Sequence, residues 1–207
     1  IIIPNFNTFF CFNTRKNNPI YYRFAGNLGF KTKKQDLPKT IPQLQKIFNK
    51  HHNEKGLIHC NSIEFKTFIK ESFANTKNSK RLVTYDRSKN EGKGSKLHEL
   101  RLFKESDDPL ILVSYSMQEG IDLPYDNCRF QIFYKAPFLP TNDNQIKARM
   151  ERDPNWYNIK AIQKVIQMRG RGMRAEDDYS RNYIIDKGFY RIIKNKKTPN
   201  EFLEAII

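Results

Sequence analysis

The sequence predicts an α/β fold, in which a mostly parallel sheet is flanked by helices on both faces. Short, continuous apolar runs such as Leu110–Val113 are typical of strands that are buried on both sides. These runs alternate along the chain with segments whose apolar residues recur at the helical period, which is the pattern of a parallel sheet with crossover helices. We therefore expect a single domain over residues 1–207, with residues 1–36 as an irregular leading segment.

The first half of the chain supplies three expected strands. Residues 1–36 are aromatic and basic without a clear period, and within them only Ile20–Phe24 reads as a strand. A helix is expected from Thr40 to about His52, because its apolar residues fall on one stripe. The run Gly56–Cys60 predicts a buried strand, and Ser62 is a possible N-cap for the next helix. Further expected elements are a strand at 82–85, a loop at 89–94 and a helix at 95–104.

The second half continues the alternation. Strands are expected at 110–113, 130–134 and 183–186, and helices at 143–152 and 155–168. A last helix is expected near the end of the chain, capped by Thr198 and with Pro199 in its first turn. No internal repeat or linker interrupts this order, so one sheet is expected to collect all the strands.

The charge of the chain favours a polyanionic partner. Its 37 lysine and arginine residues against 22 acidic residues give a formal net charge of +15. Nucleic acid is the first candidate, since each phosphate that is neutralised releases condensed counterions. The alternative is a lysine-rich protein whose charge is spread evenly over its surface.

Cysteine and histidine usage argues against disulfides and against a metal site. Cys11, Cys60 and Cys128 are too scattered for a disulfide framework, which favours an intracellular location. The candidate ligands His51, His52, His59 and Cys60 satisfy no ligand spacing, and the adjacent histidines point in different directions, so no metal site is expected. No apolar run is long enough to span a membrane, and Ile1–Pro4 does not read as a signal peptide.

The segment Gln167–Arg174 has the pattern Q-x-x-G-R-x-x-R. A helix would place Arg171 and Arg174 on one face, three residues apart, as a pair of planar and permanently charged guanidiniums. Such a pair suits the clamping of a nucleotide triphosphate. The alternative is a basic helix end whose arginines pair with the acids at 176–178.

Polar residues follow two expected strands, at the edge where open α/β sheets bind their ligands. Asn61, Ser62, Ser114 and Ser116 could hold a phosphodiester without reading a base, or could be plain helix caps. In the loop that follows Ser116, Gly120 permits an unusual backbone angle. Asp122 in the same loop could orient an arginine or a water, or cap the turn.

Three groups of residues, at 59–62, 114–124 and 167–174, follow one another along the chain. In this order they resemble motifs IV, V and VI of the superfamily two helicases. The closest resemblance is to the second, RecA-like motor lobe of DinG/XPD-like DNA helicases. This lobe is the second of the two lobes of a helicase with the P-loop NTPase fold. It rests on the segments 19–22, 55–59, 116–124, 129–135, 137–140, 147–150, 167–174 and 177–179.

The resemblance implies a motor in which ATP with Mg²⁺ lies between two lobes and is held mainly by the first. By motif match, Arg171 and Arg174 are the arginine fingers and Gln167 senses the γ-phosphate or its attacking water. Glu119, Gly120, Asp122 and Gly170 border the nucleotide, and the four polar strand-end residues grip single-stranded DNA.

The chain contains no G-x-x-x-x-G-K-[ST] phosphate loop, so we expect that it is a piece of a longer protein and does not hydrolyse ATP alone. Its partners are then the N-terminal lobe of the same polypeptide and DNA, with no membrane. The iron-sulfur cluster of many relatives belongs to the first lobe and is not expected here. Alternative functions are a non-catalytic nucleic-acid-binding module, a duplex DNA translocase or an RNA helicase.

Overall fold

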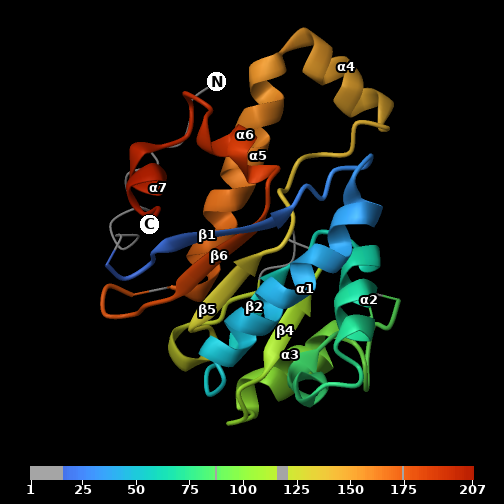
Figure 1. The fold of residues 1–207 in the computed structure, drawn as a ribbon, viewed down its shortest axis with the longest axis vertical. Coiled ribbons are helices and arrows are strands. Elements are labelled where there is room, and N and C mark those ends of the chain that lie inside the picture. The colour runs from blue at the N-terminus through green and yellow to red at the C-terminus, as the bar shows by residue number, and fades with distance from the viewer. Residues whose placement is uncertain (1–15, 87, 116–120, 174) are drawn as a thin grey trace.

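The computed structural model describes residues 16–86, 88–115, 121–173 and 175–207. Its strands form one six-stranded sheet in the order β1-β6-β5-β2-β4-β3, and every neighbouring pair is parallel (Figure 1). This confirms the predicted fold class. The strands are β1 (Ile20–Gly26), β2 (Gly56–His59), β3 (Leu82–Val83), β4 (Ile111–Ser114), β5 (Phe130–Phe133) and β6 (Arg181–Asp186).

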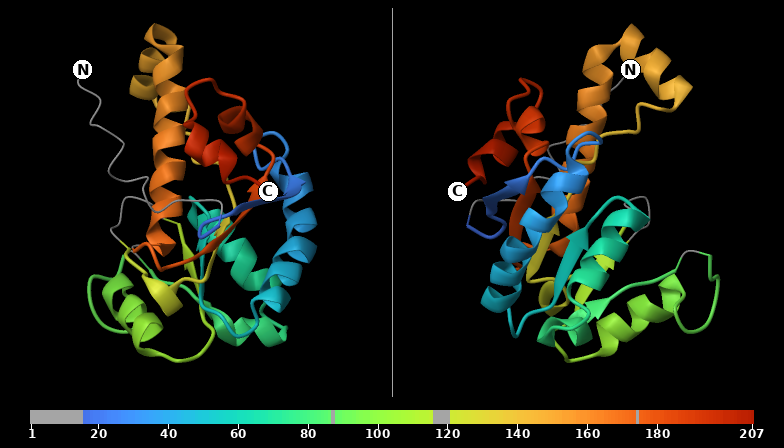
Figure 2. Two further views of the ribbon diagram at one scale, coloured as in Figure 1. Left: turned by 90° about the vertical axis from the view of Figure 1, so that its left-hand side faces the viewer. Right: turned by 45° about the vertical axis from the view of Figure 1, so that its right-hand side comes forward.

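Helices cover both faces of the sheet. The crossovers from β1 to β2 and from β2 to β3 run in one direction along the sheet, whereas those from β3 to β4 and from β5 to β6 run in the other. Since parallel crossovers are right-handed, α1 (Lys33–Lys50) and α2 (Ile63–Ser72) lie on one face, and α3 (Lys96–Glu105) and α5 (Pro154–Arg169) lie on the opposite face (Figure 2). The remaining helices are α4 (Asn144–Arg152), α6 (Phe189–Ile193) and α7 (Asn200–Glu204).

Strand β5 shows how the two faces differ. Phe130 and Ile132 pack with residues of α1 and α2 in one core cluster, whereas Phe133 packs with residues of α5, α6 and α7 in a second cluster. This alternation follows from the pleat, which directs successive side chains to opposite faces. Gln131 shares the α5 face with Phe133 and is fully buried there. The sheet therefore carries a polar side chain inside its α5 face.

The leading segment is more regular than expected. Strand β1 continues to Gly26, and α1 begins at Lys33, seven residues before the expected Thr40, so the irregular assignment was wrong for residues 25–26 and 33–36, whereas residues 1–15 lie outside the described residues. Pro38 and Pro42 lie inside α1, and a proline in a helix interior costs about 3 kcal/mol. The helix persists because its apolar stripe is buried against the sheet, at Leu37, Leu44, Ile47 and Phe48.

Two features near the end of the chain also differ from expectation. Thr198 does not cap α7, whose N-cap is Pro199 without a side-chain hydrogen bond. The hydroxyl of Thr198 donates instead to the carbonyl oxygen of Ile192. This bond fastens the start of α7 to the end of α6. The short helix α6 was missed, because five residues are too few to show a helical period. None of the helices in the described part of the chain is long and apolar enough to cross a membrane.

Candidate nucleotide and nucleic-acid interface

The arginine run follows α5 and contacts the loop at 121–124. Helix α5 ends at Arg169, and Gly170–Gly172 continue it as one 3₁₀ turn. Nη1 of Arg171 donates to the carbonyl oxygen of Ile121 at 2.9 Å, and the N–H of Leu123 donates to the carbonyl oxygen of Arg171 at 3.4 Å. Two segments that lie about fifty residues apart in the sequence therefore meet through both the backbone and the side chain of one arginine.

Packing around Gly172 fixes where this turn lies. A Cβ at position 172 would lie 2.8 Å from Oγ of Ser180, 2.9 Å from Nε2 of Gln131 and 3.0 Å from Sγ of Cys128. Cys128 and Ser180 come just before β5 and β6, and Gln131 is the second residue of β5. The arginine turn therefore lies on the α5 face, near the starting ends of these strands, and not beyond their carboxyl ends.

The other residues that were expected to border the nucleotide differ in their exposure and in their neighbours. Gln167 is exposed on α5, and Asp122 is exposed in the loop that contacts Arg171. Gly170 has a φ of −68°, and a Cβ there would meet nothing within 4 Å. Its lack of a side chain is therefore not required by the neighbours that the structure describes. Arg174, Glu119 and Gly120 lie outside the described residues, as does Ser116.

The strand-end group gathers at the carboxyl edge of the sheet. His59 and Ser114 are partners in register at the ends of β2 and β4, and Asn61 and Ser62 follow β2 directly. Asn61 has a φ of 62°, which is uncommon for a residue with a side chain, and its Nδ2 donates to the carbonyl oxygen of Lys135 at 2.9 Å. The amide bond thus ties the loop after β2 to the loop after β5.

The two serines of this group that the structure describes, Ser62 and Ser114, are engaged within the fold. Oγ of Ser62 accepts from the N–H of Phe65 at 3.3 Å, so this residue is the helix cap that the sequence allowed. Ser114 is buried, and its Oγ lies 3.1 Å from the hydroxyl oxygen of Tyr85. What the edge offers to a ligand is therefore the N-terminus of α2 together with the left-handed backbone at Asn61.

The acidic run at 176–178 anchors the chain before β6. Nη1 of Arg129 lies 2.9 Å from Oδ1 of Asp178, whose side chain is fully buried. Asp178 also accepts from the N–H of Tyr125 at 3.0 Å, and the Tyr125 hydroxyl donates to Asp177 at 3.2 Å. These bonds fasten the segment after the arginine turn to the one that leads into β5.

His59 joins the two parts of the site. It is almost fully buried, and burial lowers the pKa of its imidazole to about 3, with the positive charge of Arg171 acting in the same direction. A hydrogen bond between its Nε2 and Oε1 of Gln131, at 3.0 Å, opposes this shift. The imidazole is therefore neutral near pH 7 and donates to Gln131. It connects the end of β2 with the neighbourhood of the arginine turn.

Sequence reasoning assigned no role to four buried polar residues around this turn. Gln131 interrupts an apolar strand, and that interruption was the available signal, whereas Asn182 comes just before the expected strand at 183–186. Arg169 is 1% exposed, and burial lowers its pKa to about 10. Asn18 lies in the leading segment, where no pattern marked it.

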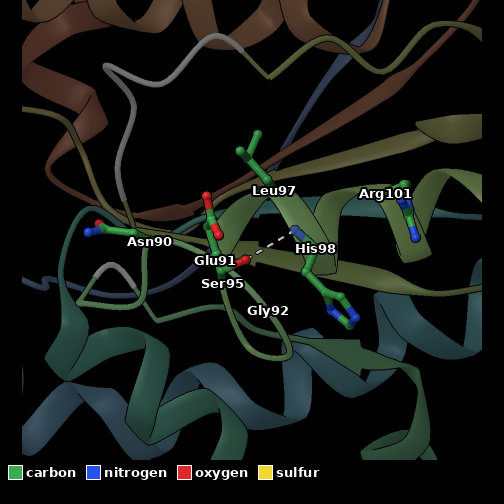
Figure 3. Close-up of a pocket in the computed structure, with 7 residues that line it drawn as sticks. All are labelled: Asn90, Glu91, Gly92, Ser95, Leu97, His98 and Arg101. Carbon is green, nitrogen blue, oxygen red and sulfur yellow. Dashed lines mark hydrogen bonds between the residues drawn. The ribbon is translucent and has the colours of Figure 1, made fainter.

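Two hollows in the described part of the surface lie away from this site. One of about 270 Å³ is lined by the loop before α3 and by the first turns of that helix, where Ser95 accepts from the N–H of His98 (Figure 3). A second lies beside the end of α1, next to His52, Lys77 and Arg81. Among the described residues, no group of three histidine, cysteine, aspartate or glutamate side chains is placed to hold a metal ion.

Comparison with protein families decides the identity of the chain. The model of the helicase C-terminal domain family matches residues 44–206, a span that begins within α1 and ends after α7. The chain belongs to the helicase C-terminal domain family. The predicted resemblance to the DinG/XPD-like helicases is thereby confirmed, and both the arginine turn and the strand-end group lie within the matched span.

Individual relatives agree with this assignment. The helicase C-terminal domain is 25% identical over 160 residues to the general transcription and DNA repair factor IIH helicase subunit XPD of Dictyostelium discoideum. The match covers 73% of this chain and 19% of that protein, so the chain spans about a fifth of the length of its curated relative.

Solved structures share the fold. The XPD apo structure superposes with a TM-score of 0.63 and 16% identity over 89% of this chain and 39% of the other. Xpd4 of S. tokodaii gives 0.59 and 15%, over 91% and 37%. The C-terminal domain of the DEAD-box protein Dbp5 gives 0.52 and 12%, over 85% and 81%. The sheet and its helices are therefore those of RecA-like helicase lobes.

Proposed function

We propose that this chain is the second motor lobe of an ATP-dependent DNA helicase. In this role it supplies positive charge to a nucleotide that is held mainly by a first lobe, and it grips the backbone of single-stranded DNA. The observation that carries the proposal is the hydrogen bond from Arg171 to the carbonyl oxygen of Ile121, within a chain of the helicase C-terminal domain family.

The proposed chemistry on this lobe is electrostatic. Phosphoryl transfer places growing charge on the phosphate oxygens, and a guanidinium fixed at the right position stabilises that charge without having to reorganise. Arg171 is partly exposed and is held by the loop at 121–124, which supports a role as the finger. Arg174 is proposed as the second finger and Gln167 as the γ-phosphate sensor. Glu119, Gly120, Asp122 and Gly170 are proposed to border the nucleotide.

ATP and Mg²⁺ are assigned mainly to the first lobe. The described residues of this lobe fit a contact with the phosphates, because they include exposed or half-buried guanidinium and amide groups. When bound, the magnesium nucleotide supplies the phosphoryl group. This chain orients one of its own guanidiniums toward it.

The proposed grip on DNA uses the carboxyl edge of the sheet. Asn61 and Ser62 precede α2, whose free N–H groups favour an anion such as a phosphodiester. Ser114 and Ser116 complete the proposed group, with Ser114 acting through its bond to Tyr85 as a support. Such contacts hold a backbone without reading its sequence. The net charge of +15 supports the same partner.

The test is steady-state ATP hydrolysis by the full-length protein that contains this chain. We expect hydrolysis to be stimulated most by single-stranded DNA, less by duplex DNA and RNA. Stimulation by duplex DNA alone would make the protein a translocase, and stimulation by RNA alone would make it an RNA remodeller. Nucleic-acid binding without any hydrolysis would leave a non-catalytic binding module and overturn the motor assignment.

A further inference from the structure

A closed ring of hydrogen bonds lies inside the sheet next to the arginine turn. Nε2 of Gln131 donates to the carbonyl oxygen of Arg169 and to Oδ1 of Asn182, at 3.0 Å in each case. Nδ2 of Asn182 donates to Oδ1 of Asn18. The guanidinium of Arg169 closes the ring by donating to the carbonyl oxygen of Asn18, from Nη2 at 2.6 Å and from Nε at 3.2 Å.

All four side chains of this buried ring are removed from water. Gln131, Asn182 and Asn18 are 0% exposed, and Arg169 is 1% exposed. Leaving one buried hydrogen-bonding group without its partner costs about 1–3 kcal/mol, and more when the group is charged. Loss of one member would therefore leave its neighbours in the ring without their partners, which favours one well-defined geometry.

The buried ring holds Arg169, the residue immediately before the arginine turn at Gly170–Gly172. Arg169 contributes both its side chain and its carbonyl group, and Gly170 and Arg171 follow it directly. The turn also rests on Gln131, because a Cβ at Gly172 would lie 2.9 Å from Nε2 of that amide. Oε1 of Gln131 accepts in addition from Nε2 of His59 at 3.0 Å. One amide thus connects β2, β5, β6 and the turn.

We propose that Gln131 is a positioning residue, which sets the place of the Arg171 guanidinium by holding the carbonyl group of Arg169 and the underside of the turn. This inference rests on the proposed function, since it assigns to Arg171 the role of a finger. A group that stabilises a transition state must be placed to within a fraction of an ångström, and a shift of about 1 Å costs about 100-fold in rate. A buried amide with a single satisfied arrangement provides such a constraint.

The test compares variants of the full-length protein in DNA-stimulated ATP hydrolysis. Gln131→Met keeps the volume and removes the donors, so we expect kcat to fall about 10- to 100-fold while KM for ATP and the affinity for DNA change less than about threefold. In the Arg171→Ala background, Gln131→Met should cause no further loss of kcat. Amide hydrogen exchange at residues 170–173 should accelerate in Gln131→Met, which reports the loosened turn without relying on activity.

A matched control separates positioning from plain destabilisation. Ile69→Val shortens a fully buried side chain of α2, in the core cluster on the opposite face, and should lower Tm while leaving kcat unchanged. The inference fails if both variants lower kcat in the same proportion to their loss of Tm. The loss of kcat in Gln131→Met would then reflect lost stability alone, and Gln131 would be a merely structural residue. Unchanged kcat in Gln131→Met alongside a large loss in Arg171→Ala also overturns the inference. Unchanged kcat in Arg171→Ala overturns the proposed function itself.

Discussion

The guanidinium of Arg171 donates a hydrogen bond to the carbonyl oxygen of Ile121, 2.9 Å away. Only one of its donor nitrogens is needed for this bond, and a guanidinium has five N–H groups in a rigid fork. The bond to Ile121 can therefore orient the side chain while other N–H groups face a phosphate. A lysine at this position would have a single ammonium group and no planar fork.

We expect Arg171→Ala and Arg171→Lys to impair turnover to different extents. In the full-length protein, Arg171→Ala should lower kcat for ATP by about 10³- to 10⁵-fold, the range given for an arginine finger. Arg171→Lys should retain part of the activity because it keeps the charge. The affinity for DNA, measured by fluorescence anisotropy, should be unchanged in both variants. Wild-type turnover in Arg171→Ala would remove the finger assignment.

Glycines 170 and 172 are expected to respond oppositely to alanine. Gly172→Ala places a methyl group 2.8 Å from Oγ of Ser180 and 2.9 Å from Nε2 of Gln131, so the free energy of unfolding should fall by about 1–3 kcal/mol. Gly170→Ala is the matched control, because its φ is −68° and a Cβ there meets no neighbour within 4 Å. It should be neutral or stabilising by up to about 1 kcal/mol.

Urea titrations of the two variants measure this difference. Equal losses of stability in both would contradict the packing of Gly172 against β5 and β6. A second readout is ATP hydrolysis by the full-length protein, where Gly172→Ala should lower kcat because it lifts the turn off Gln131. Gly170→Ala tests whether the proposed nucleotide site needs a small residue at that position.

His59 should make the fold sensitive to acid. Its pKa is about 3 in the folded state and near 6.5 in an unfolded chain, so between these values the unfolded state binds more protons. The free energy of unfolding therefore decreases as pH falls from about 6.5 toward 3, with a limiting slope of about 1.4 kcal/mol per pH unit from this group. Above pH 7 the group contributes no pH dependence.

The measurement is urea unfolding at pH values from 4 to 7.5, for the unchanged chain and for His59→Gln. The variant should show a shallower decline in acid, because the titrating group has been removed. His51 is also buried with a lowered pKa and remains in both proteins, so the difference between the two curves isolates His59. Parallel curves would show that His59 is not held neutral in the fold.

Sequence patterns predicted most of the fold, because each β-strand of this sheet contains or adjoins a short apolar run. The start of α1 was missed for a physical reason: Pro38 and Pro42 weaken the local helical signal, and only burial of Leu37 and Leu44 against the sheet outweighs them. A local pattern contains no information about that burial.

The candidate site was also predicted from the sequence only in part. The residue types and order around Arg171 carried the family resemblance, and the family match confirmed it. The contact with Ile121 and the position of the turn on the α5 face depend on how the chain returns across the sheet between β4 and β5, which no spacing encodes. Gln131 was passed over because one polar residue inside Phe130–Phe133 does not change the prediction of a strand.

Asn61 provides a last test, at the edge proposed to grip DNA. Its φ of 62° suits glycine and asparagine but is strained for a β-branched residue, so Asn61→Val should destabilise the fold by about 2 kcal/mol or more. Asn61→Gly keeps a residue that readily adopts this φ while losing the bond from Nδ2 to the carbonyl oxygen of Lys135, so its net effect on stability should be within about 1 kcal/mol.

The glycine variant then separates stability from binding at this edge. Because Asn61→Gly keeps the backbone and the N–H groups at the start of α2, binding that depends on the backbone should retain most of its affinity for single-stranded DNA. A loss of more than about tenfold in affinity, with stability preserved, would instead assign the contact to the Asn61 side chain. Asn61→Val should weaken binding by distorting the loop, and a fully stable Asn61→Val variant would contradict the left-handed conformation at this residue.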